Sequence, residues 1–146
     1  MEAAIQVKLK EKLWVYIVDN NPEVVLALQE STSVFRFLEE MVAAVWPLAL
    51  QLLAEEKPQY IVEELCLENL THGLKPSRFL YIRNILEEEF AATYEHLREA
   101  GVLTYETVNL IAFCDEIFES FSFTIENEDD PMLRYAIVGQ ISGYLD

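Results

Sequence analysis

Apolar residues recur every three to four positions along almost the whole chain, and no stretch alternates apolar and polar residues as a half-exposed strand does. Proline and glycine mark the expected helix ends. Pro22 and Pro58 stand near helix starts, whereas Gly73 and Gly101 stand just past helix ends. The pattern therefore predicts an all-α fold, a multihelical bundle of six to seven helices with short connections.

A chain of 146 residues has the usual length of one domain, and no repeat or low-complexity segment interrupts it. We expect residues 1–146 to form a single helical domain. Within it, the helix that starts after Ser33 should kink or restart at Pro47, because proline removes a backbone donor. A long helix capped by Ser77 should follow, either straight or bent near Phe90.

The most apolar run is residues 41–54, MVAAVWPLALQLLA, between Glu40 and Glu55. It is shorter than the roughly 20 residues that a helix needs to cross a bilayer. The pattern thus predicts a core helix. The amino terminus is charged and lacks an early apolar run, so no signal peptide is predicted and a cytoplasmic protein is expected.

The chain carries 26 acidic and 10 basic residues, a formal net charge of -16. Such a surface repels phosphate backbones and anionic headgroups, so direct binding to nucleic acid or to an acidic membrane is disfavoured. Two explanations remain for the acidity. One is solubility. The other is an acidic DNA mimic of the anti-restriction type, which requires acids gathered on one face, for instance Glu55, Glu56, Glu63 and Glu64 with the cluster at 126–130.

Familiar catalytic and metal-binding patterns do not occur in the sequence. His72 and His96 both lack the glutamate three residues earlier that carboxylate-bridged metal sites require. Cys66 and Cys114 stand far apart in apolar patterns and are expected to be buried. Only four glycines occur, and none forms a phosphate-binding loop. We therefore expect no cofactor, no metal and no catalytic residue.

Residues 73–84, GLKPSRFLYIRN, gather three of the ten basic residues, namely Lys75, Arg78 and Arg83. Arg78 follows the expected cap Ser77, where the helix dipole disfavours a cation, so a specific acceptor elsewhere is implied. The leading interpretation is an ion pair between helices in which Arg78 binds a glutamate of residues 55–68. A solvated surface and an anion or partner site are the alternatives. Arg83 could reach Glu87, one turn later.

The last predicted helix contains Gly139 and Gly143 in the segment GQISG. A spacing of four places both glycines on one helical face. The segment lies on a helix rather than after a strand, and Ser142 does not fit the spacing of a nucleophile elbow. The glycines are therefore expected to let a neighbouring helix pack closely.

Residues 70–90, LTHGLKPSRFLYIRNILEEEF, resemble the central signature of a small all-helical family of unknown function from Bacteroidetes-type bacteria, often encoded on mobile or conjugative elements. The segment YIVDNNP at 16–22 is loosely similar to the family's opening region, and LRYAIVGQISGYLD at 133–146 is similar to its closing helix. The resemblance implies a helical fold and a genomic setting, and it brings no known activity. The matching positions are Leu70, Gly73, Leu74, Ser77, Arg78, Glu89 and Phe90.

A hydrophobic fraction of 52% is slightly rich for so small a domain. It indicates either a well-filled core or a surface that binds another protein or a second copy. The sequence therefore predicts a non-catalytic, cytoplasmic helical protein that acts through protein–protein interaction or self-association, as a homodimer or small oligomer. The alternatives are the DNA mimic and an enzyme of unfamiliar type. Such an enzyme would use clustered glutamates, Glu63, Glu64, Glu87 and Glu88.

Overall fold

The computed structural model describes residues 2–31 and 33–146. These residues form nine α-helices and one short 3-10 helix, and no strand occurs among them. The all-α prediction is confirmed. The number of helices exceeds the predicted six to seven because two of the expected helices are divided, one at Phe90 and one at Cys114.

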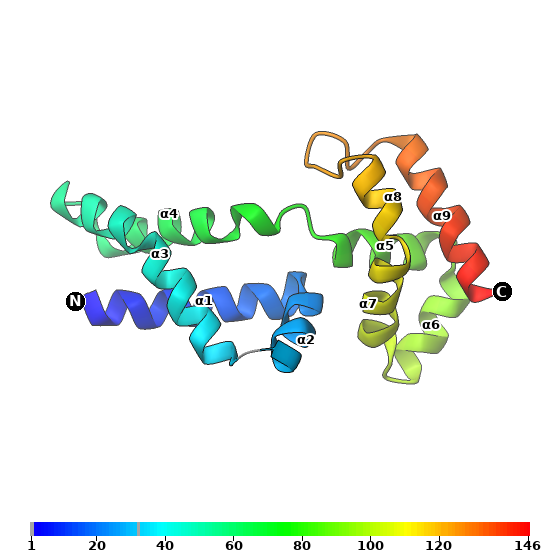
Figure 1. The fold of residues 1–146 in the computed structure, drawn as a ribbon, viewed down its shortest axis with the longest axis horizontal. Coiled ribbons are helices and arrows are strands. Elements are labelled where there is room, and N and C mark those ends of the chain that lie inside the picture. Colours follow the sequence, from blue (N-terminus) through cyan, green and yellow to red (C-terminus); the bar gives the residue numbers. More distant parts are fainter. Residues whose placement is uncertain (1, 32) are drawn as a thin grey trace. The chain divides into compact units, whose positions relative to one another are not determined.

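The chain divides into two compact units, Met1–Leu74 (unit 1) and Lys75–Asp146 (unit 2), each with its own core (Figure 1). The sequence analysis expected one domain over residues 1–146. The boundary between the two units lies within the segment GLKPS at 73–77, whose Gly73 and Ser77 were interpreted as a helix end and a helix cap rather than as a linker.

Unit 1 contains α1 (Glu2–Asn20), α2 (Pro22–Ser31), α3 (Val34–Ala54), α4 (Gln59–Thr71) and the 3-10 helix η1 (His72–Leu74). Helices α1, α3 and α4 pack against one another, and α2 packs on α1 and α3 (Figure 1). One apolar stripe of each long helix builds the core, as the 3.6-residue period predicts. The core residues are Ile5, Leu9, Leu13, Ile17, Val42, Val45, Ala49, Leu52, Val62, Cys66 and Leu70.

Helix α3 begins where the sequence indicated, since the side chain of Ser33 accepts a hydrogen bond from the backbone N–H of Arg36 at 3.4 Å. It then runs through Pro47 to Ala54 as one helix, so of the two predicted outcomes, a kink or a restart, the restart does not occur. Pro47 is exposed. The helix tolerates it there because the ring faces away from the core.

Unit 2 contains α5 (Arg78–Glu89), α6 (Ala91–Glu99), α7 (Leu103–Phe113), α8 (Asp115–Ser120) and α9 (Pro131–Leu145). Helices α5, α6 and α7 pack together, and α8 and α9 pack on α7 and on each other (Figure 1). The core residues are Phe79, Ile82, Ile85, Leu86, Leu110, Ile111, Cys114, Phe118, Leu133, Ile137 and Ile141.

The helix ends of unit 2 follow local chemistry. Ser77 caps α5 by accepting the N–H of Leu80 at 3.0 Å, and Asp130 caps α9 by accepting the N–H of Met132 at 2.9 Å. Phe90 leaves helical geometry between α5 and α6, with φ −135° and ψ 50°. Gly101 closes α6 at φ +76°, a conformation that glycine adopts without steric cost.

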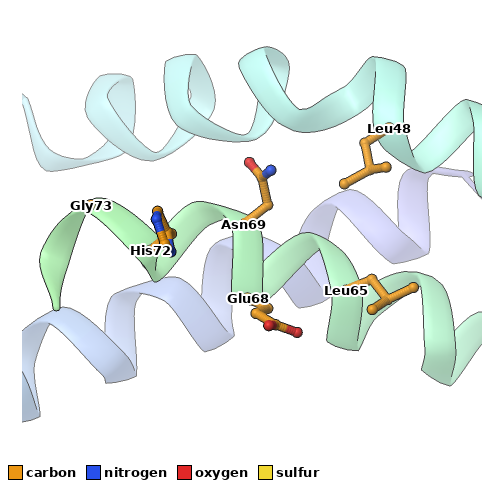
Figure 2. A pocket seen from close by; sticks show the side chains of 6 residues that line it. All are labelled: Leu48, Leu65, Glu68, Asn69, His72 and Gly73. Carbon is orange, nitrogen blue, oxygen red and sulfur yellow. The ribbon is translucent and has the colours of Figure 1, made fainter. Parts of the chain in front are cut away.

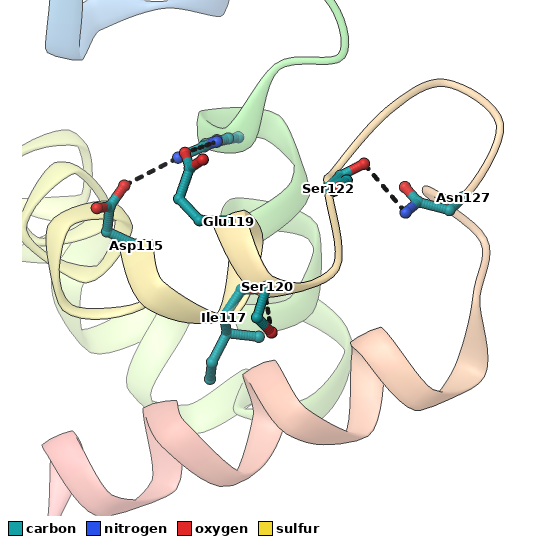
Figure 3. Close-up of polar contacts among 7 residues, drawn as sticks. Asp115, Ile117, Glu119, Ser120, Ser122 and Asn127 are labelled. Atoms are coloured by element: carbon teal, nitrogen blue, oxygen red, sulfur yellow. Dashed lines mark hydrogen bonds and ion pairs between the residues drawn. The ribbon is translucent and has the colours of Figure 1, made fainter.

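One side chain, that of Asn127, makes several of the hydrogen bonds that hold the loop at 122–130, including the bond to Ser122 drawn in Figure 3. The Asn127 amide donates to the carbonyl oxygens of Phe121 at 2.6 Å and Ser122 at 3.2 Å, and its oxygen accepts the N–H of Thr124 at 2.8 Å. These bonds satisfy backbone groups that have no helical partner, so the acidic loop has a defined path.

Candidate protein-binding site

The basic stretch after Gly73 supplies a structural ion pair. Arg78, the first residue of α5, donates from Nη1 to Asp115 Oδ1 at 3.0 Å and from Nη2 to Glu119 Oε1 at 2.8 Å (Figure 3). Its guanidinium carbon also lies 4.9 Å from the ring centroid of Phe118. The predicted pairing between helices is present, but the predicted acceptor, a glutamate of residues 55–68, was wrong. Those glutamates belong to unit 1, whereas both acceptors lie one turn apart on α8.

The other residues of the stretch do not join Arg78 in a common site. The hydroxyl of Ser77 caps α5. Arg83 lies over the Phe79 ring, 5.4 Å from its centroid, and no Arg83–Glu87 pair occurs in the described part of the chain. Lys75 is exposed. Arg78 and Arg83 thus have separate local contacts, and these contacts give no support to the alternative of one anion site.

The glutamates that sequence reasoning grouped for catalysis or mimicry have different surroundings. Glu63 is 5% exposed on α4, and its Oε1 lies 3.8 Å from Lys12 Nζ, so it cannot contribute to an exposed acidic face of the kind that DNA mimicry requires. Glu88 pairs with Arg134 at 2.8 Å. Glu64 and Glu87 are exposed. Across residues 2–31 and 33–146, no group of three or more His, Cys, Asp or Glu is arranged to hold a metal ion.

The two glycines of α9 do not serve the packing predicted for them. Both are exposed, and a Cβ added to Gly139 or Gly143 would meet nothing within 4 Å. The core face of α9 is formed by Leu133, Ile137 and Ile141, which recur every four residues on the opposite side of the helix. The expectation of a close neighbouring helix within this chain was therefore wrong.

Helix α3 exposes an uncharged surface that the sequence reading missed. No charged residue occurs from Met41 to Ala54, yet only 22% of the most apolar 18-residue window of α3 is buried. By length and composition α3 is apolar enough to cross a membrane, with a mean hydropathy of 1.5 over that window. It contributes one stripe to the core and leaves the rest uncovered. We call the exposed residues the α3 face: Ala43, Ala44, Pro47, Leu50, Gln51 and Ala54.

Beside the α3 face, α3 and α4 border a groove of about 570 Å³. Leu48 and Leu65 give it apolar walls, and Glu68, Asn69 and His72 give it polar edges. In Figure 2, Leu48 extends from α3 and Asn69 from α4 into the space between the two helices. A groove with both apolar and polar groups in its lining offers the two kinds of contact that an amphipathic helix makes.

The charge around this groove has one sign. Residues 37–74 carry seven acidic residues and a single basic residue, Lys57. Glu64 and Glu68 are exposed on α4 beside the groove. A partner that covers the groove therefore gains most from basic residues at its flanks, because opposite charges steer association and favour the correct register.

Comparison of the chain with protein-family models, with curated proteins and with solved structures returned no match. The resemblance of residues 70–90 to a bacterial helical family stays a prediction.

Proposed function

We propose that this chain is a non-catalytic, cytoplasmic protein-binding module, and that the α3 face with the α3–α4 groove takes an amphipathic helix with basic flanks. One observation carries the proposal: α3 presents fourteen consecutive uncharged residues, of which six are exposed, in a chain with a net charge of -16. A patch of this kind, in an otherwise charged surface, is typical of an interaction site.

Apolar burial supplies the affinity in this proposal, and charge supplies the choice of partner. Leu50 is 46% exposed and Leu65 is 39% exposed, so covering them removes apolar area from water. The acidic edge excludes acidic partners and anionic membranes by repulsion. A helix that carries leucines on one side and lysines beside them satisfies both conditions.

A synthetic peptide tests the proposal directly. The probe is a fluorescein-labelled 18-residue peptide of leucine and lysine, with leucines at helical spacing, titrated with the protein and followed by anisotropy. We expect saturable binding that weakens at least tenfold in Leu50→Gln and Leu65→Gln, because each substitution removes apolar contact. Val7→Gln on α1, where Val7 is 53% exposed, is the matched control and should bind as the parent does.

The comparison probes separate this proposal from its rivals. A peptide of the same composition in scrambled order should not bind, and a leucine–glutamate version should bind far more weakly. Equal binding of the ordered and scrambled peptides, or binding unaffected by both leucine substitutions, would falsify the proposal. Binding to phosphatidylcholine vesicles that Leu50→Gln removes would instead assign the face to a membrane.

A further inference from the structure

The outer side of α9 presents a second uncharged surface, in unit 2. Met132 and Tyr135 are 64% and 68% exposed, and Gly139 and Gly143 follow on the same side of the helix. Spacings of three and four residues keep all four positions within one strip, since a helix has 3.6 residues per turn. We call these four residues the α9 strip.

The α9 strip is complementary in shape to itself. Two large side chains occupy its first half, and two glycines with open space above them occupy its second half. When a second copy is laid antiparallel about a two-fold axis near Ile137, Tyr135 of one copy faces Gly139 of the other. Met132 then faces Gly143 in the same way. A two-fold axis repeats each contact, which gives an isologous interface.

Charge favours this pairing over contact through the acidic parts of the surface. Each copy carries a net charge of -16, so two copies repel wherever acidic surfaces meet. From Tyr135 to Leu145 α9 carries no charged residue. The one charged side chain within the helix, Arg134, is bound to Glu88 and Glu89 of α5, away from the strip.

We propose that the α9 strip is the contact of a weak homodimer in which two copies pair antiparallel along this helix. The occupant is a second copy because the strip is complementary to itself. In an antiparallel pair, the large side chains of one copy lie over the glycines of the other. The contact is small. A helix of 15 residues is about 22 Å long, and a helix pair of this length buries less than the roughly 800 Å² per partner of a standard interface. Micromolar or weaker association follows.

Sedimentation velocity from 1 to 500 µM protein tests the dimer, and Gly139→Leu is the decisive variant. In the monomer the new side chain meets open space, and leucine favours a helix more than glycine does. The melting temperature at low concentration should therefore stay the same or rise, while dimerisation falls at least tenfold. Tyr135→Ala should also weaken the dimer. Tyr105→Ala on α7, where Tyr105 is 61% exposed, is the matched control.

Disulfide trapping tests the antiparallel orientation. Mixing Met132→Cys with a differently tagged Gly143→Cys should give a mixed disulfide under mild oxidation, whereas Met132→Cys alone should cross-link far less. The native thiols do not interfere, because Cys66 and Cys114 are buried. Raising the salt concentration should strengthen the dimer, since it screens repulsion between acidic copies.

Two outcomes would overturn the inference. One is a chain that stays monomeric up to 500 µM in high salt. The other is a dimer that Gly139→Leu leaves intact, which would assign the contact to another face. Neither outcome bears on the α3–α4 groove, because the groove lies in unit 1 and its test uses a peptide probe.

Discussion

The two units hold themselves together by different means. Unit 1 has an aliphatic core of Ile, Leu, Val, Ala and Cys, and its pairs between helices join lysines to carboxylates at longer distances, 3.4 Å for Lys10–Glu39 and 3.8 Å for Lys12–Glu63. Unit 2 adds an aromatic cluster to its aliphatic core, in which Phe118 lies against Tyr81 with ring centroids 5.7 Å apart. Two arginines, Arg78 and Arg134, each bind two carboxylates on another helix of this unit.

The difference shows how a chain with few cations distributes them. A guanidinium has a planar set of donors and can bind two carboxylates at once, whereas an ammonium acts as a point charge. Two of the four arginines of unit 2, Arg78 and Arg134, contact helices that are distant in sequence, whereas Arg83 and Arg98 contact residues of their own helices. Unit 1 leaves the α3 face without any charge. The arginine ion pairs between helices therefore lie in unit 2, and the proposed binding surface lies in unit 1.

The largest expected effect comes from the aromatic cluster. Phe118→Ala removes a fully buried ring and the surface under the Arg78 guanidinium, so unit 2 should lose about 3–5 kcal/mol. Each unit contains one buried cysteine, Cys66 in unit 1 and Cys114 in unit 2, so thiol labelling reports on each unit separately. In Phe118→Ala, Cys114 should react faster while Cys66 keeps its protection.

Leu13→Ala in unit 1 is the reciprocal test and should expose Cys66 first. If either substitution accelerates labelling of both cysteines equally, the units unfold together, and the contrast between two separately stabilised cores is wrong.

High pH should destabilise unit 2 by the next largest amount. Burial raises the pKa of the Cys114 thiol from 9.0 to about 11. Between these values the unfolded thiol ionises and the folded thiol does not, so stability is complete below pH 9 and falls as pH rises toward 11. The loss should be about 2 kcal/mol at pH 10.5 and approach about 2.8 kcal/mol above pH 11, since one pKa unit corresponds to about 1.4 kcal/mol. Urea unfolding of the parent and of Cys114→Ala at pH 8 and pH 10.5 isolates this contribution.

Burial also raises the pKa of Cys66, which gives unit 1 a slope of the same sign. Urea unfolding of Cys66→Ala at the same two pH values therefore measures the corresponding contribution in unit 1. An unchanged pH dependence in Cys114→Ala would show that the slope of the parent arises from other groups, such as the tyrosines.

Arg78→Ala should destabilise unit 2 by about 1–2 kcal/mol, because it removes two ion pairs and a cation–π contact. The loss is modest since Asp115 and Glu119 are 60% and 68% exposed and regain water when the arginine is gone. Arg78→Lys should restore less than half of it. Thermal melting of both variants gives the measurement. The comparison variant is Arg36→Ala, which removes an exposed ion pair with Glu40 at 3.6 Å. A loss no greater than that of Arg36→Ala would contradict the bracing role.

The smallest effect is expected at the corresponding pair of unit 1. Lys10→Ala removes the 3.4 Å contact with Glu39 and the contact of the ammonium with the Phe35 ring, 5.4 Å from its centroid. The free energy of unfolding should change by less than about 1 kcal/mol, because these contacts lie at the surface. A cost equal to that of Arg78→Ala, measured by the same melts, would remove the distinction between the two kinds of bridge.

Local patterns predicted the helices well, and contacts between distant residues explain what was missed. Ser33 and Ser77 cap their helices as expected because a cap depends only on the next three residues. The existence of an acceptor for Arg78 also followed from its place at a helix start. Its identity did not, because Asp115 and Glu119 are 37 and 41 residues away in sequence. Their spacing of four was a usable signal, since it places two carboxylates side by side.

The surface of α3 was missed for a different reason. A run of apolar residues is the same in sequence whether a helix lies inside a core or against water, and only four of the fourteen positions 41–54 are buried. A helix that contributes one stripe to a core needs apolar residues on that side only. Residues 41–54 carry no charge on any side, which was a usable signal. The sequence also did not show which side of α9 faces the core. That side depends on the neighbouring helices, and Gly139 and Gly143 lie on the exposed side.

Pro47 gives the α3 face a property that its apolar side chains lack. Proline has no N–H, so the carbonyl oxygen of Ala43, one turn earlier, receives no hydrogen bond from position 47. Apolar surfaces alone let a bound helix slide by a turn with little change in energy. The exposed ring of Pro47 marks one height along α3, and a partner shaped to fit the ring there is held at a single position along the helix axis.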